Sequence, residues 1–114
     1  MNADYTVAAK HLPAPGETVS GGNLRILPGG KGSNQASAAA RLGAQVCMLG
    51  AVGEDDNANF LLRKLDEAGV DTAEILHEEG VSGTTIITVD PDGRNTIVYS
   101  PGSNAKVSAG YVQS

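Results

Sequence analysis

The sequence predicts an α/β fold with a second, smaller β-sheet beside the α/β layers. Residues 33–76 follow the order helix, strand, helix, strand, which is typical of a sheet covered by helices. β-branched runs then flank Asp90-Pro91-Asp92-Gly93, a turn sequence that predicts an antiparallel hairpin. We expect four extended segments in the smaller sheet, at about 5–10, 19–27, 84–89 and 95–99.

The first of these segments contains apolar residues and threonine, which favours a strand. Pro13, Pro15 and Gly16 interrupt it, because proline cannot donate a hydrogen bond to a neighbouring strand. The second segment is extended from about residue 18 and ends at Pro28.

A glycine-rich turn at residues 29–32 leads into a predicted helix from Ser33 to Leu42. The helix is rich in alanine, with Ser33 or Asn34 expected as its N-cap and Gly43 as the residue after its C-cap. Such a turn exposes backbone amides at the positive end of a helix, which is a favourable place for polar or anionic ligand groups.

Residues 45–52 form a continuous apolar run bounded by Gly43 and Gly53, which predicts a buried parallel strand. Cys47 lies within this run, so we expect a buried, unreactive thiol. It is the only cysteine of the sequence, so no internal disulfide forms and a reducing compartment is expected.

A second helix is predicted to open at Asp55 and Asp56, where acidic side chains meet the positive helix end, and to stop at Gly69. We interpret Glu54, Asp55 and Asp56 as helix-capping residues. The apolar residues recur at helical spacing, at Ala58, Leu61, Leu62, Leu65 and Ala68. Further on, residues 101–104 are expected to be a loop, and the last ten residues the approach to another element.

Length and composition limit the classes of protein that fit. A chain of 114 residues is normally one domain, and its net charge of −5 without a Lys/Arg cluster argues against nucleic acid or anionic membrane as a partner. The apolar runs are too short to cross a bilayer, and the start lacks the pattern of a secretory signal, so we expect a cytoplasmic protein. His11 and His77 are far apart and lack further ligands at metal spacing, so both are interpreted as surface residues.

The glycine-lysine turn does not match the common nucleotide-binding loops. Arg25 stands where a P-loop requires its first glycine, and Gly32 stands where it requires Ser or Thr. A dinucleotide fingerprint starting at Gly30 would need its third glycine at Gln35. On glycine content alone, a tight turn before a helix is the simpler interpretation.

Four motifs in order carry a wider resemblance, namely Asn2-Ala3-Asp4, residues 12–18, residues 29–36 continuing to Ala44, and residues 50–55. In identity and spacing they resemble the N-terminal part of the ribokinase-like (pfkB-type) carbohydrate kinase family. The resemblance implies part of a three-layer α/β/α fold with a small antiparallel β lid, all within one kinase domain. The lid would comprise about 5–27 and 84–100, and the α/β core about 33–76.

The resemblance implies five substrate-binding residues. Asp4 corresponds to an aspartate that accepts hydrogen bonds from sugar hydroxyls, and Asn2 to an asparagine beside it. Gly30 and Lys31 match the turn that lies against the sugar, and Asn34 matches an amide that hydrogen-bonds it. For Lys31, an approach to the transferred phosphate and an ordinary surface position remain equal alternatives. Without its context, Asp4 would be interpreted as a solvated acid.

The resemblance further implies transfer of the γ-phosphate of ATP to the 5-hydroxyl of D-ribose, with Mg²⁺, a monovalent cation as a further candidate, and a homodimer formed through the lid. The family's catalytic base and anion hole lie in a C-terminal Gly-Ala-Gly-Asp type motif, which does not occur here, and Met1 stands where a preceding buried strand should end. We therefore assign no catalytic residue and no metal ligand, and expect a chain truncated at both ends and inactive alone. The alternatives are a related kinase for another sugar or a nucleoside, and a non-catalytic sugar-binding or dimerising module.

Overall fold

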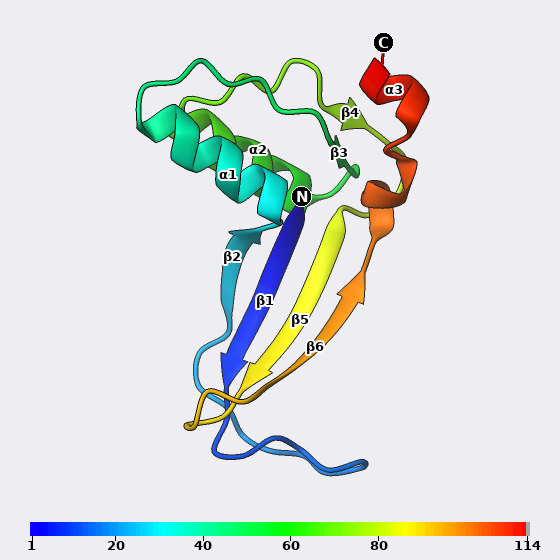
Figure 1. The fold of residues 1–114 in the computed structure, drawn as a ribbon. Coiled ribbons are helices and arrows are strands. Elements are labelled where there is room, and N and C mark those ends of the chain that lie inside the picture. Colours follow the sequence, from blue (N-terminus) through cyan, green and yellow to red (C-terminus); the bar gives the residue numbers. More distant parts are fainter. Residues whose placement is uncertain (114) are drawn as a thin grey trace.

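The computed structural model describes residues 1–113 and divides them between a projecting sheet and a helical part (Figure 1). The sheet has four strands in the order β2-β1-β5-β6. Their bounds are β1 Asn2–Ala8, β2 Arg25–Gly29, β5 Gly83–Val89 and β6 Asn95–Ser100. The four predicted segments therefore do combine into one small sheet.

The pairing within this sheet corrects one expectation. β2 is antiparallel to β1 and β6 is antiparallel to β5, as the turn chemistry predicts, but β1 and β5 run parallel. Parallel strands need a long crossover connection, and the helical part of the chain between β1 and β5 supplies it. The sheet is consequently mixed rather than wholly antiparallel.

The strand bounds also differ from those predicted. β1 begins at Asn2 instead of residue 5, and β2 extends through Pro28 to Gly29. Proline is tolerated there because β2 is an edge strand of the sheet. Residues 19–24 are irregular, with only an isolated bridge between Ala9 and Gly21.

The helical part confirms the predicted order of helix, strand, helix, strand. Helices α1 (Lys31–Arg41) and α2 (Asp56–Ala68) pack against each other, and two short parallel strands, β3 (Ala51–Val52) and β4 (Leu76–His77), lie beside them (Figure 1). A hydrogen bond of 2.8 Å from Tyr5 Oη to Asn57 Oδ1 joins β1 to the first turn of α2.

Helix α1 begins two residues earlier than predicted. Its N-cap is Gly30 with φ of 101°, not Ser33 or Asn34. The Ser33 hydroxyl cannot cap the helix because it donates backwards, to the carbonyl oxygens of Gly29 at 2.7 Å and Gly30 at 3.1 Å. Gly43, with φ of 100°, follows the C-cap as predicted.

The predicted caps of α2 are confirmed at Asp55 and Gly69, whereas Glu54 precedes the N-cap and Asp56 is the first residue of the helix. Asp55 Oδ1 accepts hydrogen bonds from Ala58 N at 2.9 Å and Ser82 Oγ at 2.7 Å, and Asp55 Oδ2 accepts from Ser82 N at 2.8 Å. Gly69 ends the helix in the left-handed conformation. The Asp55 carboxylate thus caps α2 and also ties it to the segment before β5.

Replacing Asp55 with alanine is expected to lower the free energy of unfolding by about 1–3 kcal/mol, because a cap is lost and Ser82 N loses its acceptor. Burial alone would raise the pKa of Asp55, but the hydrogen bonds from Ser82 and Ala58 lower it below its usual value. Its contribution is therefore full above the unfolded-state pKa and is lost as the pH falls through the folded-state pKa. Urea unfolding at pH 7 and at acidic pH measures both effects. Asp56→Ala, at an exposed neighbouring position, is the control; equal losses for the two variants would contradict the capping role.

The core lies between the two helices and the short strands. Its buried members are Ala36, Val52, Ala58, Leu61, Leu65, Ala68, Val70 and Ile75. Val46 and Met48 pack against this cluster, whereas Cys47 is exposed and Leu49 is 41% exposed. The prediction of a buried Cys47 is therefore wrong.

The physical reason is that residues 46–49 alternate between two faces, and within residues 1–113 only one face is covered. The run is also not a continuous strand. It makes an isolated bridge between Cys47 and Asp71 before β3 begins.

The C-terminal segment is more ordered than the predicted loop. Pro101 precedes a short 3₁₀-helix, η1 (Gly102–Lys106), which includes the rest of the predicted loop, and α3 (Ala109–Gln113) follows. His11 and His77 are exposed, as predicted, and His11 lies 2.9 Å from Glu17. Within the described part of the chain, no helix combines the length and apolar character needed to cross a membrane.

Candidate functional site

A polar surface forms at the end of β1 that lies next to α1. Asn2 and Asp4 are two residues apart in β1, so their side chains project from the same face of the sheet. On that face Asp4 is flanked by Leu27 and by Thr85, which is only 8% exposed. Asn2 is flanked by Gly29 and Gly83.

The two glycines beside Asn2 leave room for the polar side chains. A Cβ atom on Gly29 would lie 2.5 Å from Asp4 Cγ, so the carboxylate rests directly against the Gly29 α-carbon. A Cβ atom on Gly83 would lie 2.6 Å from Asn2 Oδ1. Because Gly29 and Gly83 lack side chains, the side chains of Asp4 and Asn2 can lie against the neighbouring strands.

The Asp4 carboxylate is half-buried and receives no hydrogen bond from any residue among 1–113. Both of its oxygens keep their full capacity to accept hydrogen bonds. The ammonium group of Met1 is half-buried, and this burial lowers its pKa. The negative charge of Asp4 acts in the opposite direction and raises the pKa of the ammonium group.

The glycine-lysine turn adjoins this surface. Gly30 lies close to the start of the chain, since a Cβ there would be 3.3 Å from Met1 Cα. Lys31 and Asn34 lie exposed on the first turn of α1. The amides of Lys31, Gly32 and Ser33 precede the first hydrogen bond of the helix, which Asn34 N donates to Gly30 O at 3.0 Å, and so remain available as donors. The structure thus brings Asn2, Asp4 and Gly30 together, with Lys31 and Asn34 at the adjacent helix end.

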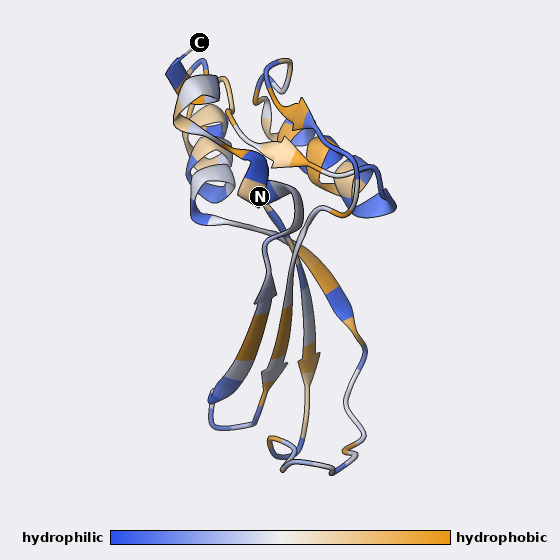
Figure 2. Ribbon diagram, turned by 90° about the vertical axis from the view of Figure 1, so that its right-hand side faces the viewer, coloured by the Kyte–Doolittle hydropathy of each residue, from blue (hydrophilic) through white to orange (hydrophobic). Residues whose placement is uncertain are grey.

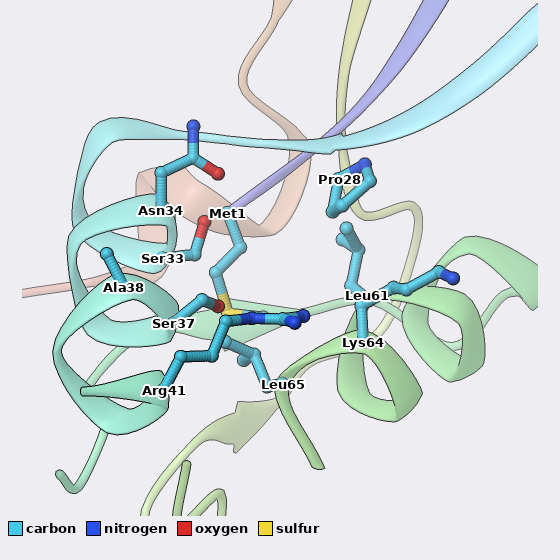
Figure 3. A pocket seen from close by; sticks show the side chains of 10 residues that line it. All are labelled: Met1, Pro28, Ser33, Asn34, Ser37, Ala38, Arg41, Leu61, Lys64 and Leu65. Carbon is cyan, nitrogen blue, oxygen red and sulfur yellow. The ribbon is translucent and has the colours of Figure 1, made fainter. Parts of the chain in front are cut away.

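Asn34 also lines a separate pocket of about 290 Å³ between α1 and α2. Arg41 and Met1 point into this pocket, whereas the amide of Asn34 points away from its centre (Figure 3). None of the other four predicted residues lines it. The pocket is therefore a different surface from the one that carries Asp4.

Asn104 is a residue of this surface that the sequence did not reveal. Its side chain hydrogen-bonds Met1 and also Asn2 Oδ1, the latter at 2.7 Å. A loop asparagine carries no distinguishing signal in the sequence, because its role depends on η1 lying against the start of β1. Pro101 and Gly102 before it indicate a turn, but not that the turn lies against β1.

Similarity to solved structures identifies the fold class. The Arabidopsis thaliana ribokinase complexed with ribose and ATP superposes with a TM-score of 0.82 and 33% identity, covering 90% of this chain and 34% of that one. A Cryptococcus neoformans ribokinase in complex with ADP gives a TM-score of 0.75 and 38% identity, covering 90% of this chain and 32% of that one. The architecture is that of the ribokinase fold.

The chain belongs to the pfkB family of carbohydrate kinases, whose model matches residues 1–112. Among curated relatives, the ribokinase of Bacillus subtilis is 43% identical over 111 residues, which is 95% of this chain and 37% of the relative. This chain therefore spans little more than a third of the length of that relative.

Proposed function

We propose that this chain forms the sugar-binding side of an ATP-dependent ribokinase, as the N-terminal part of a single kinase domain. The whole protein would transfer the γ-phosphate of ATP to the 5-hydroxyl of D-ribose. The observation that carries the proposal is the Asp4 carboxylate, which rests against Gly29 without a hydrogen-bond donor from residues 1–113 and lies two positions from the Asn2 amide.

This arrangement suits a polyhydroxylated ligand. A carboxylate accepts hydrogen bonds from two neighbouring hydroxyl groups, and such charge-assisted bonds are stronger than neutral ones. Asn2 supplies an amide beside it, and Gly30, Lys31 and Asn34 supply the adjacent turn and helix end. In this proposal these five residues bind and orient the sugar.

The metal ligands, the ATP contacts and the catalytic base that the reaction requires are not assigned to residues of this chain. Among residues 1–113, no three His, Cys, Asp or Glu side chains gather as a metal site. As the resemblance implies, we propose that the ligands of Mg²⁺ and of a monovalent cation, the ATP contacts and the catalytic base belong to the rest of the whole protein. ATP would supply the transferred phosphoryl group, and we place the reaction in the cytoplasm.

A sugar panel tests the proposed substrate. The whole protein is assayed with ATP against ribose, deoxyribose, a hexose and a nucleoside, with ADP release as the readout. We expect the highest kcat/KM for ribose. Turnover of another acceptor without turnover of ribose would contradict the substrate assignment, and ribose binding without any turnover would indicate a non-catalytic sugar-binding module.

We also propose that the four-stranded sheet pairs with the sheet of a second copy. The register aligns Ile26, Ile86 and Val98 in one row across the face opposite Asp4, and their exposures are 42%, 49% and 67%. Figure 2 shows the apolar segments along these projecting strands. Such exposed apolar rows are typical of protein interfaces.

Val98→Asp is expected to shift the whole protein from dimer to monomer, because a charge would be buried in an apolar interface. Sedimentation velocity measures the change. Asn95→Asp, on the same strand but on the opposite face, is the control. A wild-type protein that sediments as a monomer would rule out the dimer.

A further inference from the structure

We propose that Asn104 is a positioning residue that fixes the orientation of the Asn2 amide, so that Asn2 presents its NH₂ group to the sugar. The inference rests on the proposed function and adds to it a rule of ligand selection. Hydrogen bonds join Met1 to Asn104 and Asn104 to Asn2.

The backbone around Asn104 is firmly placed. Ser103 N donates to Val81 O at 2.9 Å, Ser103 Oγ donates to Ala51 O at 3.2 Å, and Asn104 N donates to Pro101 O at 2.9 Å. Gly102 lies against the backbone of residues 81–82, where a Cβ atom would be 2.8 Å from Ser82 O. The 3₁₀-helix η1 therefore holds Asn104 at a defined position beside β1.

Met1 determines which way the Asn104 amide points. Asn104 Oδ1 accepts from Met1 N at 3.0 Å, and Asn104 Nδ2 donates to Met1 O at 3.0 Å. The Met1 nitrogen, the ammonium group of this chain, is a donor, and the Met1 carbonyl oxygen is an acceptor. A reversed Asn104 amide would place its NH₂ group against the Met1 nitrogen and its oxygen against the Met1 carbonyl oxygen, so neither hydrogen bond could form. Only one orientation of the Asn104 side chain is compatible with both contacts.

Asn104 in turn determines the orientation of Asn2. Its Nδ2 group lies 2.7 Å from the Asn2 side chain, and because Nδ2 is a donor, the atom it meets must be Asn2 Oδ1. The same NH₂ group also approaches Tyr99 Oη at 3.2 Å. Among residues 1–113 nothing accepts a hydrogen bond from Asn2 Nδ2, on the face of β1 that also carries Asp4.

The surface therefore offers a hydrogen-bond donor at Asn2 Nδ2 and a hydrogen-bond acceptor at the Asp4 carboxylate, in a fixed order along β1. A ligand group at Asn2 must supply a lone pair, whereas the groups at Asp4 must supply protons. A hydroxyl group satisfies either position, but an ammonium group is accepted only at Asp4. Asn104 imposes this selection without touching the ligand.

Asn104→Asp tests the proposal in the whole protein. The change is isosteric, but it replaces the donor that faces Asn2 by an acceptor, so the Asn2 amide reverses and presents its oxygen to the sugar. We expect the KM for ribose to rise roughly three- to tenfold, the effect of one hydrogen bond, with a smaller change in kcat. Asn104→Ala, which leaves Asn2 free to take either orientation, is expected to give a smaller rise.

Two controls separate positioning from a general loss of structure. Asn95→Asp makes the same change of charge at an exposed site on β6 and should leave the KM unchanged. In an Asn2→Ala background, Asn104→Asp should add no further rise in KM, because its effect passes through Asn2. An additive effect in that double variant would overturn the proposal.

A ligand-free measurement keeps this test independent of the proposed function. In NMR spectra of the whole protein, Asn104→Asp should bring the Asn2 NH₂ protons next to residue 104, with a shift of their resonances. Unchanged Asn2 resonances would overturn the positioning role even if ribose proved not to be the substrate. An altered Asn2 amide without any ribose turnover would refute the proposed function and retain the positioning role.

Discussion

Asp4→Asn is expected to raise the KM of the whole protein for ribose by roughly ten- to a hundredfold or more. The change removes the charge and one acceptor oxygen, and a hydrogen bond to a charged group contributes about 1.5–3 kcal/mol. The carboxylate has no hydrogen-bond donor among residues 1–113 that would rearrange when it is replaced. Stability should consequently change much less than sugar affinity, and enzyme kinetics combined with thermal unfolding measures both.

Asp92→Asn is the matched control for this variant. Asp92 lies in the hairpin turn between β5 and β6, and its side chain is 77% exposed. The same chemical change there should leave the KM for ribose unaltered. If Asp4→Asn behaved like Asp92→Asn, Asp4 would not belong to the sugar site.

Gly29→Ala is expected to have a comparable effect on sugar binding, although residue 29 carries no functional group. The added Cβ would lie 2.5 Å from Asp4 Cγ, so the carboxylate must turn away from its position. Overpacking of this kind costs about 1–3 kcal/mol of stability. We expect the KM for ribose to rise as in Asp4→Asn, accompanied by a lower unfolding midpoint.

Two further variants identify the cause of that loss. Gly22→Ala adds a Cβ whose nearest contact is an ordinary 3.9 Å from Ala8 O, so neither affinity nor stability should fall. In an Asp4→Ala background the obstructing carboxylate is gone, and Gly29→Ala should then cost little stability. A full stability loss in that background would show that Gly29 acts on something other than Asp4.

Elements specified by local chemistry could be predicted from the sequence. Helix α2 follows from the Asp55 cap, the apolar spacing and Gly69, and the β5–β6 hairpin follows from its turn sequence, because each signal acts within a few residues. The cap of α1 was missed for an equally local reason. Ser33 is a good capping residue, but its hydroxyl donates to Gly29 and Gly30 instead.

Features that depend on distant parts of the chain could not be derived from the residues alone. The parallel pairing of β1 with β5 joins segments that are far apart in sequence, and the apolar run around Cys47 does not reveal which of its faces is covered. Asn104 became visible only once η1 was placed beside β1. The positions of Asn2 and Asp4 came from the resemblance, while their shared face and the glycines that make room for them came from the structure.

A crystal structure of the whole protein with ribose tests the central claim most directly. We predict that ribose lies on the face of β1 that carries Asn2 and Asp4, with two hydroxyl groups donating to the Asp4 carboxylate and one ribose oxygen accepting from Asn2 Nδ2. Ribose bound instead in the pocket between α1 and α2, against Arg41 and away from Asp4, would contradict the account.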